Sequence, residues 1–229
     1  EVIGLSRGKN RSGRDDFRYV NIDVTNHELL KHKIKTIQPD FVVNTAAMTN
    51  VDACENDKSG CFDLNVSVVQ SLVDVCLEID AYLIHLSTDF IFDGVKGNYT
   101  EEALPNPLSY YGETKLISEQ IIQDSKVKHT ILRTILVYGL VNDMSRSNIV
   151  LWVKESLENN KEVNIVNDQY RAPTYVGDLA LACKLSMDKK AMGVYHVSSN
   201  TLLSIYEIAL EIADAFQLNK NLIKPIATS

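Results

Sequence analysis

The residues in this sequence with the clearest capacity for chemistry are a tyrosine and a lysine four positions apart, Tyr111 and Lys115. On a helix, two residues with this spacing lie on the same face. An ammonium group close to a phenol favours the phenolate, and so brings a hydroxyl with a pKa of about 10 toward the working range of a proton donor. The pair alone is a weak signal, because any helix can carry a surface lysine beside a packed tyrosine.

A hydroxyl group from Ser87 or Thr88 would complete the chemistry that this pair needs. Both residues follow an apolar run, 82–86, that is typical of a strand buried on both faces. In an open parallel sheet, ligands bind at the carboxyl ends of the strands. A hydroxyl at that edge could polarise a carbonyl while the tyrosine protonates the alkoxide formed from it. The four residues together therefore predict a site that reduces a carbonyl group.

The pattern around these residues predicts the elements that must hold them. Apolar runs at 1–6, 17–22, 41–43, 82–86 and 130–138 indicate strands. Helical periodicity covers a segment capped by Thr25 or Asn26 and ending at 37, a long segment ending near 79, and 115–122. Alternation of strand and helix at intervals of about 30–45 residues predicts an α/β fold with a doubly wound parallel sheet.

After residue 140 this rhythm loosens. Helices are expected at 149–157, 178–187 and 205–216, and short strands at 162–166 and 194–197. We therefore predict one domain over 1–140, and over 141–229 mainly a smaller lobe that is interleaved with the last strands of the sheet.

Composition excludes several classes of protein. Of the 229 residues, 45% are hydrophobic and 23% charged, which is the balance of a globular chain and not of a disordered one. The net charge of −7 and the lack of a basic tract argue against a nucleic-acid or membrane-surface partner. No stretch approaches the roughly 20 apolar residues of a membrane helix, and we find no signal-peptide pattern. We therefore expect neither nucleic acid nor membrane among its partners.

The cysteines and histidines do not show the spacing of a metal site. The five histidines are scattered without a His-Glu-x-x-His pattern, so no metal centre is expected. The cysteines are predicted to be small buried residues, which fits a reducing, cytoplasmic location. They are Cys54, Cys61, Cys76 and Cys183.

Five segments in order make the chain resemble the extended short-chain dehydrogenase/reductases. Within them it is most similar to the sugar-nucleotide reductases typified by dTDP-4-dehydrorhamnose reductase. The segments are 44–52 (Asn-Thr-Ala-Ala-Met-Thr-Asn-Val-Asp), 87–94 (Ser-Thr-Asp-Phe-Ile-Phe-Asp-Gly), 111–119, 133–139 and 168–176. The resemblance implies a Rossmann-like NAD(P)-binding domain over 1–140 and a substrate-binding lobe over 141–229. It also implies reduction of the 4-keto group of a nucleotide-linked deoxysugar by NADPH or NADH, and a homodimer.

Roles follow from the resemblance residue by residue. Tyr111 would be the proton donor, Lys115 would bind the nicotinamide ribose and lower the tyrosine pKa, and Thr88 would hydrogen-bond the substrate carbonyl. Thr88, Asp89 and Arg171 would contact the substrate. The remaining positions would bind the cofactor together with Tyr111 and Lys115: Ser6, Arg7, Asp23, Val24, Ala46, Ala47, Asn65 and Ser87.

The choice between the two cofactors can be argued from the second strand of this fold. An acidic residue at its end holds a ribose 2′-hydroxyl, whereas cationic and hydroxyl groups accommodate a 2′-phosphate. Here the strand end offers Ser6 and Arg7, which favours NADPH.

The match departs from the family at residues 135–136 and at Arg171, which stands where the family usually has a glycine or another small residue. Ile135 and Leu136 replace the Ser and Trp of the family's Arg-Thr-Ser-Trp-Val-Tyr-Gly, so the exact sugar stays open. Of the ten glycines, none forms Gly-x-Gly-x-x-Gly. Because the resemblance aligns Glu1 with the family's second strand, we expect the first strand, its glycine-rich turn and the first helix to be missing from this chain.

Two other readings compete with reduction. The fold and the Tyr/Lys pair also serve nucleotide-sugar dehydratases and epimerases, but dehydratases carry Thr-Asp-Glu where this chain has Thr88-Asp89-Phe90. A non-catalytic NADP-binding subunit, like the regulatory β subunit of methionine adenosyltransferase, is the alternative of a different class. In such proteins the Tyr/Lys pair tends to be lost, and here it is intact.

Overall fold

A computed structural model of the chain describes residues 1–140 and 148–228. The chain divides into two compact units, one made of Glu1–Thr134 with Leu181–His196, the other of Ile135–Ala180 with Val197–Ser229. The border predicted between 140 and 141 falls beside residues 141–147, which lie outside the described part, so that border stays a prediction.

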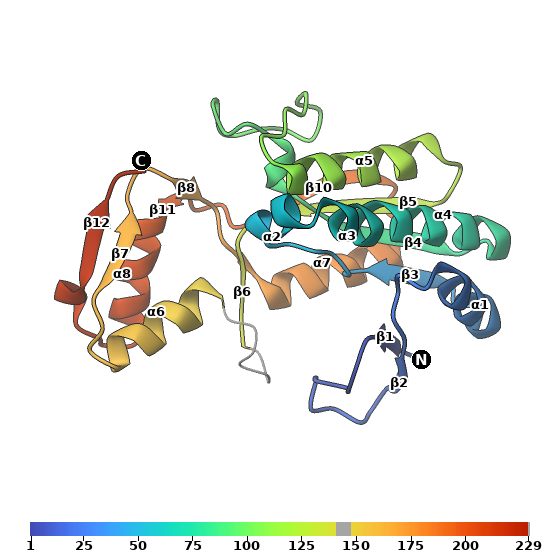
Figure 1. The fold of residues 1–229 in the computed structure, drawn as a ribbon, viewed down its shortest axis with the longest axis horizontal. Coiled ribbons are helices and arrows are strands. Elements are labelled where there is room, and N and C mark those ends of the chain that lie inside the picture. Colours follow the sequence, from blue (N-terminus) through green and yellow to red (C-terminus); the bar gives the residue numbers. More distant parts are fainter. Residues whose placement is uncertain (141–147, 229) are drawn as a thin grey trace. The chain divides into compact units, whose positions relative to one another are not determined.

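A four-stranded sheet forms the centre of the first unit (Figure 1). Its strand order is β10-β5-β4-β3, and β3, β4 and β5 pair in parallel. All seven residues of β4 except Leu86 are buried, as expected of a central strand covered on both faces. The strands are β3 (Phe41–Asn44), β4 (Tyr82–Thr88), β5 (His129–Thr134) and β10 (Gly193–Val197).

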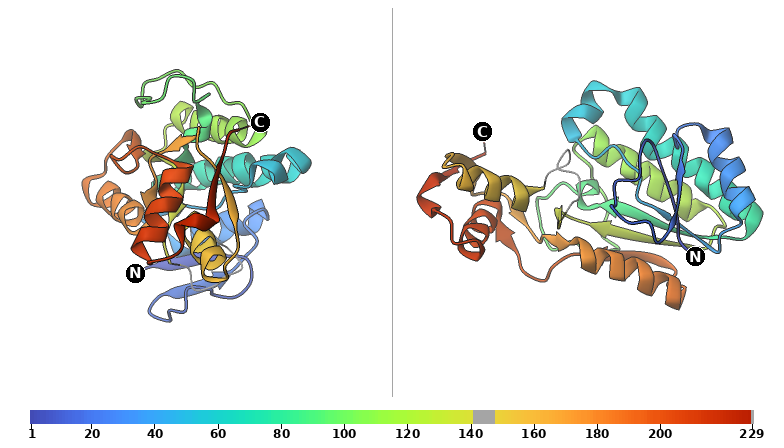
Figure 2. Two further views of the ribbon diagram at one scale, coloured as in Figure 1. Left: turned by 90° about the vertical axis from the view of Figure 1, so that its left-hand side faces the viewer. Right: turned by 90° about the horizontal axis from the view of Figure 1, so that it is seen from below.

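Helices cover both faces of this sheet, which makes it doubly wound (Figure 2). On one face α1 packs on α4 and α4 on α5, and the part of α7 from Leu181 onward lies on the other face. The apolar sides of α1 and α4 build most of the core with Leu83 and Ile131 of the sheet. The helices are α1 (His27–Ile37), α2 (Val51–Asn56), α3 (Lys58–Phe62), α4 (Val68–Ile79), α5 (Tyr110–Asp124) and α7 (Val176–Lys189).

The segment from Lys58 to Ile79 is one helical run in which a π-helical turn, η1 (Asp63–Ser67), joins α3 to α4. By length and composition alone this run could cross a membrane, which the sequence analysis did not anticipate. However, 56% of its most apolar stretch is buried inside the protein, and its residues Val69, Leu72 and Val73 belong to the core. Its apolar composition is thus accounted for by packing on the sheet.

A separate parallel pair, β1 (Ile3–Ser6) and β2 (Arg18–Asn21), begins the described chain. Within the described residues this pair shares no hydrogen-bonded ladder with the four-stranded sheet. Ile22, just after β2, is nevertheless buried in the same core, and Leu5 packs against it.

The second unit has a core of its own, built by two helices and a parallel strand pair. Helices α6 (Ile149–Glu158) and α8 (Ile205–Ala215) pack with β7 (Val163–Val166) and β12 (Ile223–Ile226). Ser204 and Glu207 form a capping box that starts α8. The smaller elements are β6 (Val137–Tyr138), β8 (Tyr170–Arg171), β9 (Thr174–Tyr175), β11 (Leu203–Ser204) and the 3-10 turn η3 (Lys220–Leu222).

Two expected elements differ from the structure. The single strand expected over 130–138 is wrong, since β5 ends at Thr134 and β6 starts at Val137. Leu136 between them has a φ of 43°, in the left-handed region, which a continuous strand does not allow. The helix expected from 115 starts at Tyr110, because the Ser109 hydroxyl accepts a hydrogen bond from the Gly112 amide and caps the helix there.

Candidate active site

The predicted pair lies on the first two turns of α5, against the end of β4. The Ser109 cap places Tyr111 in the first turn and Lys115 in the second. Gly112 allows the close approach, because a Cβ at this position would collide with the backbone carbonyl oxygen of Phe90. The glycine beside the tyrosine is therefore what brings α5 onto the segment that follows β4.

Tyr111 is 7% exposed, and its ring meets the ring of Phe90 edge-on, with 5.6 Å between the centroids. Burial raises the pKa of its phenol to about 12, although a hydrogen bond with Thr88 acts in the opposite direction. Thr88 ends β4 and caps the following 3-10 turn, η2 (Asp89–Ile91), by accepting from the Phe90 amide at 3.2 Å. The structure thus brings the predicted threonine and tyrosine together.

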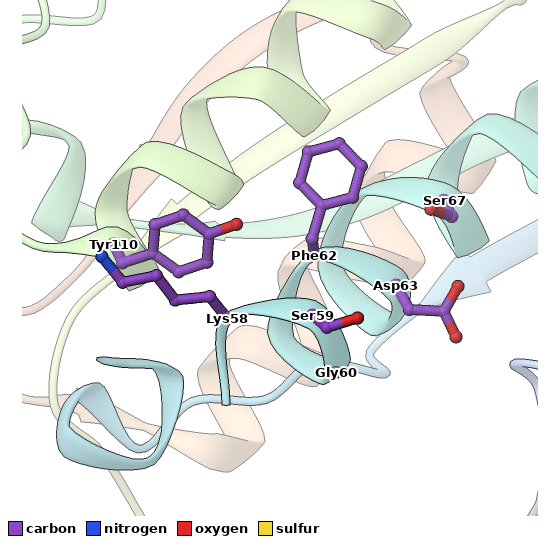
Figure 3. A pocket seen from close by; sticks show the side chains of 7 residues that line it. All are labelled: Lys58, Ser59, Gly60, Phe62, Asp63, Ser67 and Tyr110. Carbon is purple, nitrogen blue, oxygen red and sulfur yellow. The ribbon is translucent and has the colours of Figure 1, made fainter. Parts of the chain in front are cut away.

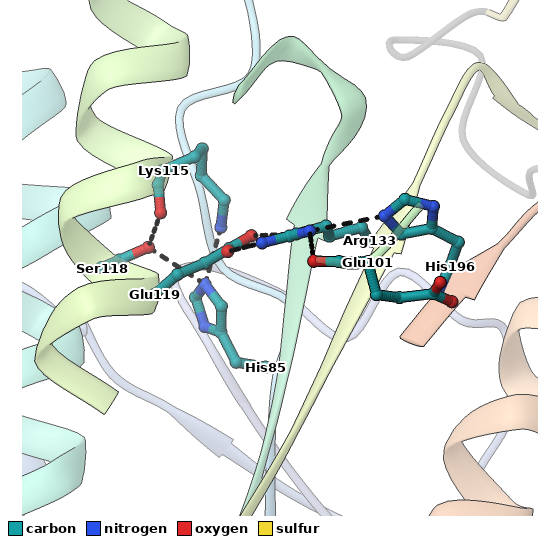
Figure 4. Close-up of polar contacts among 7 residues, drawn as sticks. All are labelled: His85, Glu101, Lys115, Ser118, Glu119, Arg133 and His196. Atoms are coloured by element: carbon teal, nitrogen blue, oxygen red, sulfur yellow. Dashed lines mark hydrogen bonds and ion pairs between the residues drawn. The ribbon is translucent and has the colours of Figure 1, made fainter. Parts of the chain in front are cut away.

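Lys115 is almost fully buried, and among the described residues no carboxylate forms an ion pair with its ammonium group. Its Nζ donates to the carbonyl oxygen of Leu86 at 2.7 Å. The same Nζ lies 2.9 Å from Nε2 of His85 (Figure 4). Burial lowers the pKa of Lys115 to about 8, while the charge of Glu119, one turn further along α5, acts to raise it.

The raised pKa of Tyr111 and the lowered pKa of Lys115 suit different steps of a proton transfer. A phenol with a raised pKa keeps its proton at neutral pH until an acceptor is in place. A lysine with a pKa of about 8 is still mostly charged at pH 7. The lowering of the tyrosine pKa that was expected from Lys115 is not seen, because burial dominates and raises the pKa of the phenol. The pair can therefore donate a proton to an oxygen held near Thr88.

Asn65 fixes the segment after β3 to the helices around the site. Its side chain accepts from the Met48 amide at 2.8 Å and donates to the Met48 carbonyl at 3.1 Å and to the Thr114 hydroxyl at 3.1 Å. It lies in the π-helical turn η1, a type of helix defect that is frequent at functional sites. The contacts of Asn65 hold neighbouring backbone in place, and its role toward a cofactor stays a prediction.

Ser87, Ala46 and Ala47 lie at the carboxyl ends of β4 and β3. The Ala46 amide donates to Oδ1 of Asn44 at 3.1 Å, which turns the chain at the end of β3. The hydroxyl oxygen of Ser87 is buried, and it has no hydrogen-bond partner among the described residues. Because a buried hydroxyl without a partner costs stability, it fits a site that is completed by a polar ligand.

The residues predicted to bind the far end of the cofactor lie at the ends of β1 and β2. Arg7 and Asp23 form an ion pair at 3.6 Å, with 83% of the arginine side chain exposed. Hydrogen bonds from Thr25 lower the pKa of Asp23 more than Arg7 does. The Ser6 hydroxyl is 2.8 Å from the hydroxyl of Tyr19. Because Asp23 also faces Arg7, the preference for a 2′-phosphate stays a prediction.

The remaining predicted residues are Val24, Asp89 and Arg171. Val24 packs against the main core beside β2, and Asp89 accepts from the Thr88 hydroxyl at 3.2 Å. Arg171 belongs to β8 in the second unit, where its guanidinium donates to the Tyr170 carbonyl at 2.8 Å.

Two groups of buried polar residues beside the pair were not predicted from the sequence. His85, in the middle of β4, contacts Lys115 and Asn44. Glu119 forms a buried ion pair with Arg133 of β5 at 2.7 Å. The available signal was a histidine inside an otherwise apolar run, because a polar residue in a strand buried on both faces must have partners.

A surface hollow of about 550 Å³ lies beside the site, and no predicted site residue lines it (Figure 3). Lys58, Phe62 and Asp63 of the helical run and Tyr110 of α5 contribute to its walls. The Lys58 ammonium lies 5.0 Å from the centroid of the Tyr110 ring. The hollow is therefore a groove on the outer side of the helices, separate from the buried pair.

All four cysteines are buried and free. Cys54 and Cys61 pack with Tyr111, and burial raises the pKa of Cys54 to about 12, so it is a poor nucleophile. In the described part of the chain no three His, Cys, Asp or Glu side chains gather as metal ligands would. The cytoplasmic location inferred from the cysteines stays a prediction.

Comparison with known proteins decides the family. Residues 2–229 match the family described as the RmlD substrate binding domain. The chain belongs to this family. A dTDP-4-dehydrorhamnose reductase from Aggregatibacter actinomycetemcomitans is 31% identical over 203 residues, which are 86% of this chain and 68% of that protein.

A solved structure supports the same family assignment. The dTDP-4-dehydrorhamnose reductase from Bacillus anthracis in complex with NADP superposes with a TM-score of 0.89 at 25% identity, over 99% of this chain and 84% of that one. The Rossmann-like fold and the likeness to sugar-nucleotide reductases of the RmlD type are thus confirmed.

Another relative is named as a subunit of a different enzyme, not as a reductase. Subunit beta of methionine adenosyltransferase 2 from Rattus norvegicus is 34% identical over 224 residues. The match covers 96% of this chain and 66% of that protein, so the chain spans about two thirds of its length. Membership of the RmlD family therefore does not by itself decide between catalysis and a subunit role.

Proposed function

We propose that this chain reduces the 4-keto group of a nucleotide-linked deoxysugar with NADPH or NADH. The observation that carries the proposal is the intact set of Thr88, Tyr111 and Lys115, brought together at the end of β4 in a member of a reductase family. Relatives that act as reductases and a solved neighbour that holds NADP support it.

The residues at the strand ends fit a nicotinamide nucleotide. The buried Ser87 hydroxyl, which has no hydrogen-bond partner in the part of the chain that the structure describes, offers a hydrogen-bonding group at the carboxyl edge of the sheet, where such ligands lie. Lys115, Ala46 and Ala47 would hold the nicotinamide end, and Ser6, Arg7, Asp23 and Val24 the adenosine end. When bound, the nucleotide would supply the hydride.

The chain's own residues would then handle the proton. Thr88 would hold the carbonyl oxygen of the sugar by a hydrogen bond, and Tyr111 would give that oxygen its phenolic proton. Lys115 would stabilise the phenolate by its charge. Asp89, next to Thr88, and Arg171 of the second unit would contact the substrate, the arginine by pairing with a diphosphate.

The test is a panel of nucleotide-linked 4-keto-6-deoxysugars with NADPH, followed by loss of NADPH absorbance. At least one sugar should be turned over, and Tyr111→Phe should lower that turnover by about two orders of magnitude or more, the usual scale for loss of a general acid. Tyr111→Phe should leave NADPH binding nearly unchanged. Tyr110→Phe is the matched control, because this neighbouring ring faces the outer groove, and it should keep the turnover.

The likeness to subunit beta of methionine adenosyltransferase 2 favours one second candidate, a nucleotide-binding subunit without turnover. It would be supported if NADPH binds, no sugar in the panel is reduced, and the chain co-elutes with a methionine adenosyltransferase catalytic subunit. Turnover of any sugar that depends on Tyr111 would contradict it.

A further inference from the structure

Behind Lys115 lies a buried row of polar side chains that the proposed reaction does not use. His85 is 1% exposed in the middle of β4 and faces Lys115 and Ser118 on α5 (Figure 4). Its other ring nitrogen contacts Asn44 at the end of β3. The partners of the ring among the described residues are these side chains, so the position of each proton depends on the neighbouring groups.

On one side of the ring, Asn44 determines which nitrogen carries the proton. The Ala46 amide donates to Oδ1 of Asn44 at 3.1 Å, so the carboxamide turns its NH₂ group toward His85. That NH₂ group lies 3.1 Å from Nδ1 of His85. Because the NH₂ group can only donate, Nδ1 must accept, and a neutral His85 then carries its proton on Nε2.

On the other side, Nε2 faces Ser118 and Lys115. The Ser118 hydroxyl, 3.2 Å from Nε2, donates its own proton to the Lys115 carbonyl at 2.6 Å, so its oxygen is ready to accept. Nζ of Lys115 is 2.9 Å from Nε2. A neutral amine can accept from an Nε2 proton, whereas an ammonium group has only donors and would meet that proton head-on.

Ser118 can still accept the Nε2 proton at 3.2 Å, but the 2.9 Å contact between Nε2 and a charged Nζ would then join two donors. Charging Lys115 therefore favours a rearrangement of the whole row. Nε2 must become an acceptor, so the ring proton moves to Nδ1. The Asn44 carboxamide must then turn its oxygen toward the ring, and it releases the Ala46 amide. The contacts within the row are kept with donor and acceptor exchanged, and only the hydrogen bond from the Ala46 amide is lost.

We propose that His85 is a positioning residue that couples the charge of Lys115 to the Ala46 segment through the tautomer of its ring, with Asn44 selecting the tautomer. An acceptor that takes the Ala46 amide proton would thus favour the charged lysine. The consequence for catalysis rests on the proposed function, because only there does the charge of Lys115 support Tyr111. The proton arrangement itself does not depend on that function.

The groups that face this row from every side are consistent with the coupling. Burial first, and then the charge of Lys115, hold the pKa of His85 well below its ordinary value, so the ring changes tautomer and does not become an imidazolium. Glu119 of α5 and Cys61 of α3 act to raise the pKa of Lys115, and Tyr111 lies one turn before it. The charge of Glu119 is in turn met by Arg133.

The first test is nitrogen-15 NMR of the histidine rings in the full chain, with Lys115 followed through its labelled ε-carbon. Well above the Lys115 midpoint of about pH 8, the His85 proton should be on Nε2, and well below it on Nδ1. Both changes should share one midpoint. A His85 tautomer that stays the same while Lys115 titrates would overturn the proposal. Because no turnover is measured, failure of the proposed reaction would not affect this result.

The second test is Asn44→Asp, since an ionised carboxylate can only accept. Its His85 proton should be on Nδ1 even at alkaline pH, and the Lys115 midpoint should rise. Asn164→Asp adds the same charge on an exposed position of β7 and should behave as the unaltered chain. Retention of the Nε2 proton in Asn44→Asp at alkaline pH would contradict the role of Asn44. If circular dichroism shows that this variant is unfolded, the pH series of the unaltered chain decides alone.

Discussion

Burial acts on Tyr111 and Lys115 in the same sense but moves their pKa values in opposite directions. Each group resists its charged form, which is the anion for the phenol and the cation for the amine. The site is thus prepared with the proton on the tyrosine, where a reductase needs it. The cost is a lysine whose charge the fold disfavours, and this cost can be measured.

Replacing Lys115 by Met should change how stability depends on pH. The pKa of Lys115 falls from 10.5 to about 8 on folding, so between these values the unfolded chain binds more protons than the folded one. The contribution of Lys115 to the free energy of unfolding therefore rises between about pH 8 and pH 10.5, by on the order of 1 kcal/mol per pH unit. The free energy of urea unfolding, taken as unaltered chain minus Lys115→Met, should show this rise.

Taking the difference in unfolding free energy between the unaltered chain and Lys115→Met cancels the contributions of the other titrating groups. Tyr111 and the buried cysteines have raised pKa values, so they lower stability at alkaline pH, and they do so in both proteins. A difference that is flat from pH 8 to 10.5 would mean that Lys115 is not strained by its burial.

Site residues could be predicted from the sequence where they lie close together along the chain. Tyr111 and Lys115 are four residues apart, and the glycine between them could be noticed without knowledge of the fold. His85 contacts Lys115 across 30 residues of chain and Asn44 across 41. Such contacts depend on strand order and register, so the histidine showed only as a polar residue out of place in an apolar strand.

At the scale of elements, the buried ion pair between Glu119 and Arg133 joins α5 to β5. The guanidinium donates to both carboxylate oxygens of Glu119, and it donates to the Glu101 carbonyl at 3.0 Å (Figure 4). Glu119→Leu should destabilise the chain by about 3–5 kcal/mol in urea unfolding, because it leaves a buried charge without its partner. Adding Arg133→Met should restore most of that loss.

An exposed pair provides the comparison for this prediction. Lys128 contacts Asp80 with about half of its side chain in solvent, so Lys128→Ala should cost less than about 1 kcal/mol. If Glu119→Leu costs no more than this control, the buried pair does not hold α5 on β5.

Asn65→Ala should release the segment that follows β3. Because the Met48 amide donates to the Asn65 side chain, its hydrogen exchange should become faster in the variant, as a local opening no longer breaks that bond. The Ala53 amide, which donates to Asn50, should keep its rate. Equal rates at Met48 in both proteins would mean that Asn65 does not fix this segment.

Element type was predictable wherever periodicity was strong, as in α4 and β4. The break at Leu136 was not, because a leucine in the left-handed region is disfavoured locally and must be held by the surrounding structure. The π-helical turn was equally hidden, since Asn65 contacts residues 17 and 49 positions away. Boundaries set by tertiary contacts leave no local pattern.

At the scale of the whole molecule, strand and helix alternation predicted a parallel sheet but not its order β10-β5-β4-β3. The strand at one edge of this sheet, β10, comes from the far end of the chain, after the second unit has begun. The sequence analysis expected interleaving of this kind from the loosened rhythm alone. Only the resemblance to a known family could add the strand order.

The two units have separate apolar cores, which share no residue among those described. We therefore expect Ile165→Ala to weaken the second unit by about 2–5 kcal/mol, the cost of a cavity at a buried isoleucine. Hydrogen exchange should show faster opening in α8 and β7. Amides of β4 and α4 should keep their protection, because their core is unchanged. Equal loss of protection in both units would show that the chain opens as one cooperative body, and the division into two cores would then have no energetic meaning.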